Sequence, residues 1–170
     1  KTDAPKIMSP GVLVRYILET IMTRPKVLFL CTGNSARSQM AEAFLRVYAG
    51  DQYQAYSAGI EPKGHILPHV LTVMKERGFD LSNQRSKGVD EYLGKMHFAC
   101  VITVCGDAEE NCPAVFINMG KHEHWPFHVP AKFEGSEDER LQRMREVREQ
   151  IDQRVLQWIA EQVKESEVFA

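Results

Sequence analysis

The chain has 170 residues and a formal net charge of −2, from 21 Lys and Arg against 23 Asp and Glu. A chain of this length is typical of a single domain with its own core, and the lack of a basic stripe argues against nucleic-acid binding. No apolar run reaches the roughly 20 residues of a membrane-spanning helix, so we expect no membrane association. The four Cys are too few for a disulfide scaffold, and we expect reduced thiols in a cytoplasmic protein.

Residues 1–21 precede the first predicted strand as an N-terminal extension. Its origin stays open between an expression-derived segment, an upstream translated stretch and an added helix over residues 11–22. That stretch is interrupted by Arg15 and Glu19 and lacks a small-residue cleavage site, which argues against a secretory signal. The sequence from Met22 leads directly into the first strand, so we expect one domain over residues 22–165. Deleting residues 1–21 is expected to leave turnover unchanged, because we assign no catalytic residue to them.

Strands and helices alternate along this predicted domain. Apolar runs predict four strands, over residues 27–30, 53–57, 98–104 and 115–117. Apolar residues at helical spacing predict helices from Ser38 onward, over 68–77 with an end at Gly78, near 89–93, and over 141–159. An irregular loop is expected over residues 125–133. This order predicts an α/β fold with a four-stranded, mostly parallel sheet and helices on both faces.

The loop between the first strand and the first helix consists of small residues around one cysteine and one arginine. It reads Cys31-Thr32-Gly33-Asn34-Ser35-Ala36-Arg37-Ser38. Small residues let consecutive backbone N–H groups cradle a tetrahedral oxyanion beside the positive end of the following helix, so we assign oxyanion binding to residues 32–37. Arg37 can hold two oxyanion oxygens with its planar fork. The same groups favour a thiolate nucleophile on Cys31, beneath the anion.

Ser38 has two candidate roles in this loop: it can cap the helix or hydrogen-bond to the sulfur of Cys31. The alternative interpretation of the whole loop is an ordinary buried cysteine at a strand end. That interpretation leaves Gly33, Asn34 and Arg37 without a reason, so we favour the nucleophile.

A second pair of cysteines follows the third predicted strand. Cys105 comes directly after the run Val-Ile-Thr-Val and should emerge at the same sheet edge as Cys31, where ligands bind in such folds. Six residues separate Cys105 from Cys112, which is too many for a zinc knuckle, so we expect no metal site. A disulfide between them needs Cβ atoms about 4 Å apart and therefore local unwinding. Two structural thiols are the alternative interpretation, and Cys100, inside the strand, is interpreted as a small buried hydrophobe.

These two motifs carry a family resemblance. C-T-G-N-S-x-R-S-Q-M-A-E, at residues 31–42, resembles the phosphate loop of the low-molecular-weight protein tyrosine phosphatases and, more closely, that of the thioredoxin-coupled arsenate reductases built on the same fold. V-I-T-V-C-x6-C-P, at residues 101–113, is similar to the redox half of those reductases. The resemblance extends over residues 26–160.

The resemblance implies a relay of three thiols that starts on an oxyanion. Cys31 would attack arsenate, for which phosphate or sulfate is a mimic. Cys105 would attack the adduct, releasing arsenite and leaving a Cys31–Cys105 disulfide. Cys112 would then attack Cys105, and the resulting Cys105–Cys112 disulfide would be handed to thioredoxin. No cofactor is implied, and we expect a monomer.

One position departs from the family pattern. Members of the family usually carry an Asp-Pro pair whose Asp is the general acid, whereas Val129 precedes Pro130 here. Valine cannot donate a proton, and a missing acid typically costs about 10²–10⁴-fold in rate. Three explanations stay open: His128 donates the proton, water donates it at a reduced rate, or the protein binds oxyanions with little turnover. We assign His128 as the candidate acid. The same segment contains His122, His124 and His128. We expect no metal site there, because the segment is predicted to be irregular and does not place these histidines at helical spacing.

Members of the family that the chain resembles often bind a structural potassium ion near the loop. Asn34 and Glu42 match two of its ligands, but Lys87 stands at the last ligand position. An ammonium there could pair with Glu42 and replace the ion, so we expect little potassium dependence. The alternative is that Lys87 is merely solvated.

Two other functions use the same loop. Hydrolysis of tyrosine phosphate or small aryl phosphates is the first, but it suffers more from the missing acid because an alkoxide or phenoxide leaving group needs a proton. The second is a non-enzymatic, oxyanion-binding redox sensor, which thioredoxin-dependent turnover would distinguish from a reductase. Cys105 and Cys112 favour arsenate reduction over the phosphatase.

Overall fold

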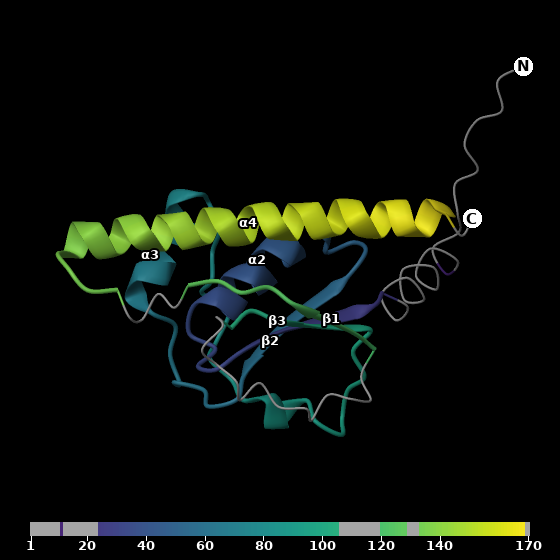
Figure 1. Ribbon diagram of the computed structural model, residues 1–170. Helices are drawn as coiled ribbons and strands as arrows, with labels where there is room; N and C mark the ends of the chain where they lie inside the picture. Colours follow the sequence, from purple (N-terminus) through teal and green to yellow (C-terminus); the bar gives the residue numbers. More distant parts are fainter. Residues whose placement is uncertain (1–10, 12–23, 106–119, 129–132, 169–170) are drawn as a thin grey trace, which may run out of the picture.

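A computed structural model of the protein describes residues 11, 24–105, 120–128 and 133–168 (Figure 1). Its core is a single four-stranded sheet in the order β2-β1-β3-β4. The strands are β1 (Lys26–Cys31), β2 (Gln54–Gly59), β3 (Cys100–Thr103) and β4 (Lys121–His124). All three pairings between them are parallel. The predicted four-stranded α/β fold is therefore confirmed, with every described pairing parallel.

The two faces of the sheet are covered differently. The described residues from 24 onward form the helices α2 (Arg37–Ala49), α3 (Pro68–Glu76) and α4 (Glu137–Val168) and the 3-10 turn η1 (Val89–Glu91). Helices α2, α3 and α4 lie together over one face, and η1 lies below the other (Figure 1). Successive side chains of β1 point to opposite faces of the sheet. Val27 and Phe29 pack in the cluster on the side of the α-helices, and Leu28 and Leu30 pack in the cluster that includes Val89. Within the described residues, the helical cover of the second face is thus one short turn.

The position of the fourth strand differs from our prediction. Residues 115–117 lie outside the described residues, and β4 lies at Lys121–His124, which we did not predict as a strand. Its four side chains are polar and mostly exposed, so no apolar run marks it. Backbone bonds hold it instead, from Lys121 N to Ala99 O at 2.9 Å and from Trp125 N to Thr103 O at 2.8 Å. The interpretation of His122 and His124 as part of an irregular segment is therefore wrong, because both lie on this edge strand.

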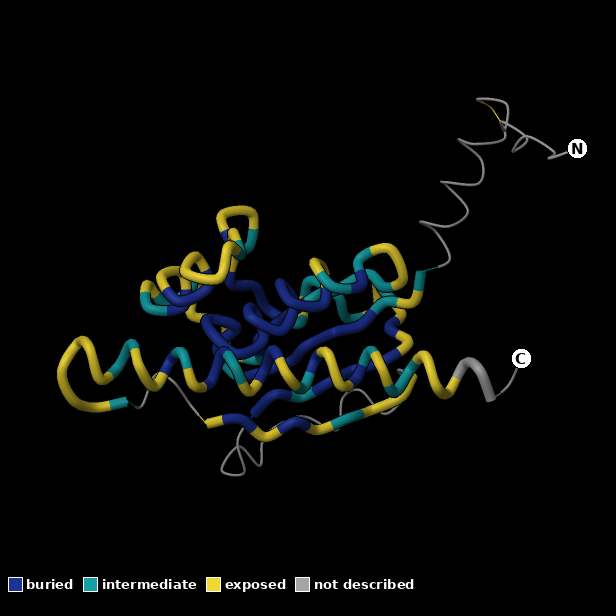
Figure 2. Tube along the Cα trace, turned by 90° about the horizontal axis from the view of Figure 1, so that it is seen from above, coloured by how far each residue is buried: buried dark blue, intermediate teal, exposed yellow. Residues whose placement is uncertain are grey.

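The long C-terminal helix is confirmed and is longer than its apolar pattern suggests. Its buried stripe contains the predicted residues Met144, Val147, Ile151, Val155 and Trp158, and buried and exposed residues alternate regularly along it (Figure 2). The helix begins earlier, at a capping box in which the Ser136 N–H donates to Glu139 Oε2 at 2.7 Å and the Glu139 N–H donates to Ser136 Oγ at 3.3 Å. In the described part of the chain, no helix combines the length and apolar character needed to cross a membrane.

Candidate active site

The loop that joins β1 to α2 wraps around the sulfur of Cys31. Asn34 has a φ of 44°, the left-handed conformation that asparagine tolerates better than most residues. Its backbone N–H donates to Cys31 Sγ at 3.1 Å, and Ser38 Oγ lies 2.9 Å from the same sulfur. The residue at the helix N-cap, Ala36, makes no side-chain cap bond. Of the two roles considered for Ser38, the structure therefore shows the hydrogen bond to Cys31.

The outer side of this loop is bonded to the segment 60–67. Four loop carbonyls accept backbone N–H groups from it: Cys31 O from Ile60 at 3.1 Å, Thr32 O from Glu61 at 2.9 Å, Gly33 O from Lys63 at 3.0 Å and Ser35 O from Leu67 at 3.0 Å. In a planar trans peptide the C=O and the next N–H point in opposite directions. The N–H groups that follow these carbonyls therefore face the inside of the loop, where a tetrahedral anion would sit.

This close approach of two chain segments requires a glycine at the end of β2. A Cβ on Gly59 would lie 2.6 Å from Thr32 O and 2.9 Å from Asn34 N. Both are backbone atoms of the anion loop, which cannot yield without losing the loop geometry. Gly59 thus lets the loop and the segment after β2 lie in contact, a role that we did not predict.

Arg37 connects the loop to the segment that carries the candidate acid. Its side chain is buried, and Nη1 donates to the carbonyl oxygen of Phe127 at 3.2 Å. The next residue, His128, is exposed. The structure thus brings the backbone beside His128 to the oxyanion arginine. Val129, where the family acid is missing, lies outside the described residues.

Cys105 lies beside the loop, as its place after a parallel strand predicts. Leu30 pairs with Thr103, and Val104 N donates to Leu30 O at 2.8 Å, so β1 and β3 end side by side. Neighbouring strands are about 4.8 Å apart. Cys31 and Cys105 are both buried, at 3% and 1% exposure, and belong to the same cluster of packed residues. Cys112 lies outside the described residues, so its approach to Cys105 stays a prediction.

The fourth cysteine is chemically different. Cys100 is 5% exposed within β3, and burial, reinforced by the Glu123 carboxylate, raises the pKa of its thiol to about 12. It therefore stays a thiol at neutral pH, which is unreactive in exchange. Cys100 behaves as the buried hydrophobe that we predicted.

Beneath the loop lies a buried polar layer centred on the Asn34 side chain. Its Nδ2 donates to Ser38 Oγ and Ser57 Oγ, both at 2.9 Å, and its Oδ1 accepts from Gln39 Nε2 at 2.8 Å and from the Lys87 backbone N–H at 2.9 Å. Gln39 and Ser57 are fully buried functional-site neighbours that our sequence reasoning missed. No pattern in the sequence marks Gln39, because it follows the polar residues Arg37 and Ser38 at the start of the helix.

The predicted pairing of Lys87 with Glu42 is confirmed, at 3.3 Å between Nζ and Oε2. Lys87 is therefore not a solvated surface lysine, and its ammonium takes the place among oxygen atoms that an ion would need. The residues present do not fit a resident potassium ion. Among the described residues, no group of three or more His, Cys, Asp or Glu is arranged to hold a metal.

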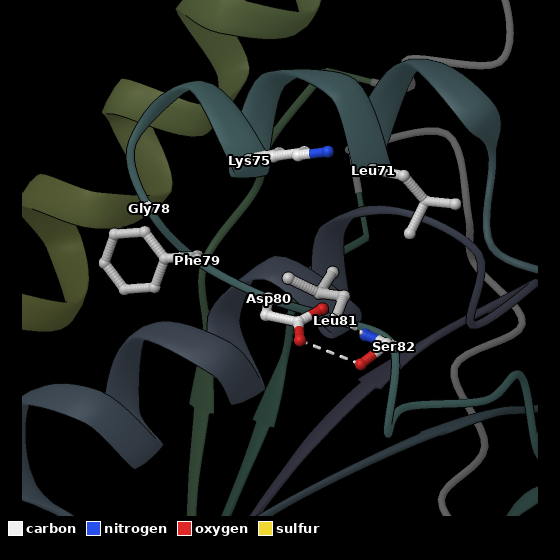
Figure 3. A pocket seen from close by; sticks show the side chains of 7 residues that line it. All are labelled: Leu71, Lys75, Gly78, Phe79, Asp80, Leu81 and Ser82. Atoms are coloured by element: carbon white, nitrogen blue, oxygen red, sulfur yellow. Dashed lines mark hydrogen bonds between the residues drawn. The ribbon is translucent and has the colours of Figure 1, made fainter.

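A surface hollow of about 500 Å³ lies elsewhere, after the end of α3. It is lined by Leu71, Lys75, Gly78, Phe79, Asp80, Leu81 and Ser82 (Figure 3). Asp80 turns back to accept from the backbone and hydroxyl of Ser82, at 2.8 and 2.9 Å, which occupies its carboxylate locally. None of the residues to which we assign a role in the reaction lines this hollow.

Comparison with known proteins places this geometry in a family. The model of the low molecular weight phosphotyrosine protein phosphatases matches residues 26–168. An arsenate reductase from Bacillus licheniformis is 44% identical over 135 residues, which are 79% of this chain and 94% of that protein.

Two solved structures give the same result. An arsenate reductase in the phosphate-binding state aligns with a TM-score of 0.67 at 31% identity, covering 81% of this chain and 98% of that one. A thioredoxin-dependent arsenate reductase from Corynebacterium glutamicum aligns with a TM-score of 0.60 at 27% identity, covering 90% of this chain and 73% of that one. The chain therefore belongs to the low molecular weight phosphotyrosine protein phosphatase family and, within it, to the arsenate reductases.

Proposed function

We propose that the protein reduces arsenate to arsenite through a relay of Cys31, Cys105 and Cys112, and that thioredoxin reduces the final disulfide. The observation that carries the proposal is the position of the Cys31 sulfur: it lies inside an anion loop, bonded by Asn34 N and Ser38 Oγ, at the sheet edge where Cys105 follows the neighbouring strand. The arsenate reductases that share 44% identity with the chain support the choice of substrate.

In the first step, the inward N–H groups of the loop and the Arg37 guanidinium bind arsenate. The Cys31 thiolate, favoured by donors from Asn34 and Ser38, attacks the arsenic atom and forms a sulfur–arsenic bond. One arsenate oxygen leaves as water after it has been protonated. We assign this proton to His128, because the carbonyl of the preceding residue is bonded to Arg37.

In the second step, the Cys105 thiolate attacks Cys31 Sγ. The electron pair of the sulfur–arsenic bond passes to arsenic, which changes from As(V) to As(III) and leaves as arsenite, while a Cys31–Cys105 disulfide forms. Cys112 then attacks Cys105 Sγ and frees the Cys31 thiolate. The dithiol of thioredoxin reduces the Cys105–Cys112 disulfide and becomes a disulfide itself. Each exchange needs reduced thiols, so we further propose that the protein works in the reducing cytoplasm. We also propose that it acts as a monomer.

The direct test is arsenate-dependent oxidation of NADPH by the purified protein with thioredoxin and thioredoxin reductase. We expect continuous turnover that stops when thioredoxin is omitted. A parallel assay with p-nitrophenyl phosphate tests the phosphatase alternative, which the same loop could serve, and we expect little hydrolysis because Val129 cannot protonate the leaving group. Rapid hydrolysis without arsenate reduction would overturn the proposal in favour of a phosphatase, and neither activity would favour the redox sensor.

The assignment of His128 gives a separate prediction. His128→Ala should lower kcat by about 10²-fold, since the leaving oxygen loses its proton donor. The measurement is kcat for arsenate across the neutral pH range. His97→Ala is the matched control, because His97 is also exposed but follows η1 on the opposite side of the sheet. An unchanged rate and pH profile would assign the proton to water instead.

A further inference from the structure

Lys87 carries its charge into the layer beneath the anion loop. The residue is only 9% exposed. Its Nζ lies within hydrogen-bond distance of three oxygen atoms: Glu42 Oε2 at 3.3 Å, Ser57 Oγ at 3.2 Å and the Arg85 carbonyl at 3.3 Å. A buried ammonium is costly unless it is paired and hydrogen-bonded. All of its donors therefore have a use here, and its position is fixed.

The donors and acceptors around Ser57 have one consistent arrangement. Ser57 Oγ donates its single proton to Glu42 Oε2 and accepts from Lys87 Nζ and from Asn34 Nδ2. Because the hydroxyl proton is used on the carboxylate, Ser57 can only accept from Asn34. The ammonium and the carboxylate together thus fix Ser57 as an acceptor for the Asn34 amide.

The orientation of this amide decides what Ser38 can do. Asn34 Oδ1 accepts the backbone N–H of Lys87, so Asn34 Nδ2 must face Ser38 and Ser57. Ser38 Oγ accepts from Nδ2 and therefore keeps its own proton for Cys31 Sγ, 2.9 Å away. A sulfur that receives hydrogen bonds from Ser38 and from the Asn34 N–H is stabilised as a thiolate.

We propose that Lys87 is a positioning residue for the nucleophile, holding Ser57 and the Asn34 amide so that the Ser38 hydroxyl points at Cys31. The inference rests on the proposed function in that Cys31 is the nucleophile. Glu42 pairs with both Lys87 and Arg46, and the role that we assign to Lys87 is to orient Ser57 through their hydrogen bond. Three oxygens around one ammonium also make a hole for a monovalent cation once the lysine side chain is removed.

The experiment compares Lys87→Ala, which opens this hole, with Lys87→Met, which fills it without a charge. The readout is the pH midpoint at which iodoacetamide alkylates Cys31, followed by mass spectrometry of the Cys31 peptide. Both variants should raise the midpoint by about one pH unit. Potassium or ammonium ions should return the Ala variant towards the wild-type midpoint but leave the Met variant and the wild type unchanged. Tetramethylammonium at equal ionic strength, which is too large for the hole, should have no effect.

A purely structural lysine would lower the melting temperature of both variants without moving the alkylation midpoint, and that result would overturn the proposal. If neither Lys87 variant folds, Ser57→Ala carries the test, since it breaks the same chain while the ammonium stays. An unchanged midpoint in Ser57→Ala would also contradict the proposal. Alkylation needs neither arsenate nor thioredoxin, so its outcome is separate from the success or failure of the proposed reductase activity.

Discussion

Cys31→Ser is expected to abolish arsenate reduction, lowering turnover by roughly 10⁴-fold or more. Serine keeps the size and the hydrogen bonds of the side chain, but its hydroxyl is not ionised near neutral pH and is a far weaker nucleophile toward arsenic. The donors that lie around the sulfur, Asn34 N at 3.1 Å and Ser38 Oγ at 2.9 Å, cannot make up for this difference. The measurement is arsenite released per enzyme in the thioredoxin-coupled assay.

The variant should still bind the anion. The inward N–H groups and Arg37 are unchanged, so calorimetry with phosphate or sulfate should give an affinity near that of the wild type. Cys100→Ala is the matched control: Cys100 is also buried, at the start of β3, and burial raises the pKa of its thiol to about 12, which keeps it out of thiol exchange. Substantial turnover in Cys31→Ser would place the nucleophile elsewhere.

Cys112→Ser is expected to stop after one turnover. Its first two steps need only Cys31 and Cys105, which lie buried in one cluster at the ends of neighbouring strands. Without Cys112, the Cys31–Cys105 disulfide cannot be passed on to a site that thioredoxin reaches, and the nucleophile stays oxidised. The burst of arsenite should therefore equal one per enzyme, with no steady state above the blank.

The control for this prediction is again Cys100→Ala, which should show continuous turnover. Cys105→Ser should differ from Cys112→Ser by releasing no arsenite at all, because the adduct on Cys31 would have no attacking thiol. A steady state in Cys112→Ser near that of the wild type would mean that thioredoxin reduces the Cys31–Cys105 disulfide directly. The third thiol would then be dispensable.

The sequence identifies those parts of the fold that bury apolar side chains. β1 is a continuous apolar run because both of its faces are covered, and the inner stripe of α4 repeats at helical spacing because it packs on the core. β4 leaves no such trace, since Lys121–His124 is a polar edge strand held by backbone bonds to its neighbour. Edge strands of this kind carry little side-chain pattern to predict from.

The candidate site, like the fold, has one part that the sequence predicts and one part that it does not. Cys31, Arg37 and Ser38 are adjacent in the chain, and their loop has a composition with a direct physical use, so the sequence predicts it. The layer beneath the loop joins residues that are far apart in the chain, such as Asn34, Ser57 and Lys87, through single hydrogen bonds. Such bonds depend on the final packing of β2 and the segment before η1. The family pattern suggested the Lys87–Glu42 pair, but nothing in the sequence indicated Ser57 or Gln39.

The central claim is that an oxidising equivalent passes from arsenic to Cys31 and then to Cys105. The most direct measurement is a disulfide map of Cys112→Ser after reaction with one equivalent of arsenate in the absence of reductant, made by proteolysis and mass spectrometry. We predict a peptide pair that joins Cys31 to Cys105, with Cys100 unmodified, in an amount equal to the arsenite released. Released arsenite with Cys31 and Cys105 both still reduced, or a disulfide that joins Cys31 to Cys100, would contradict the relay.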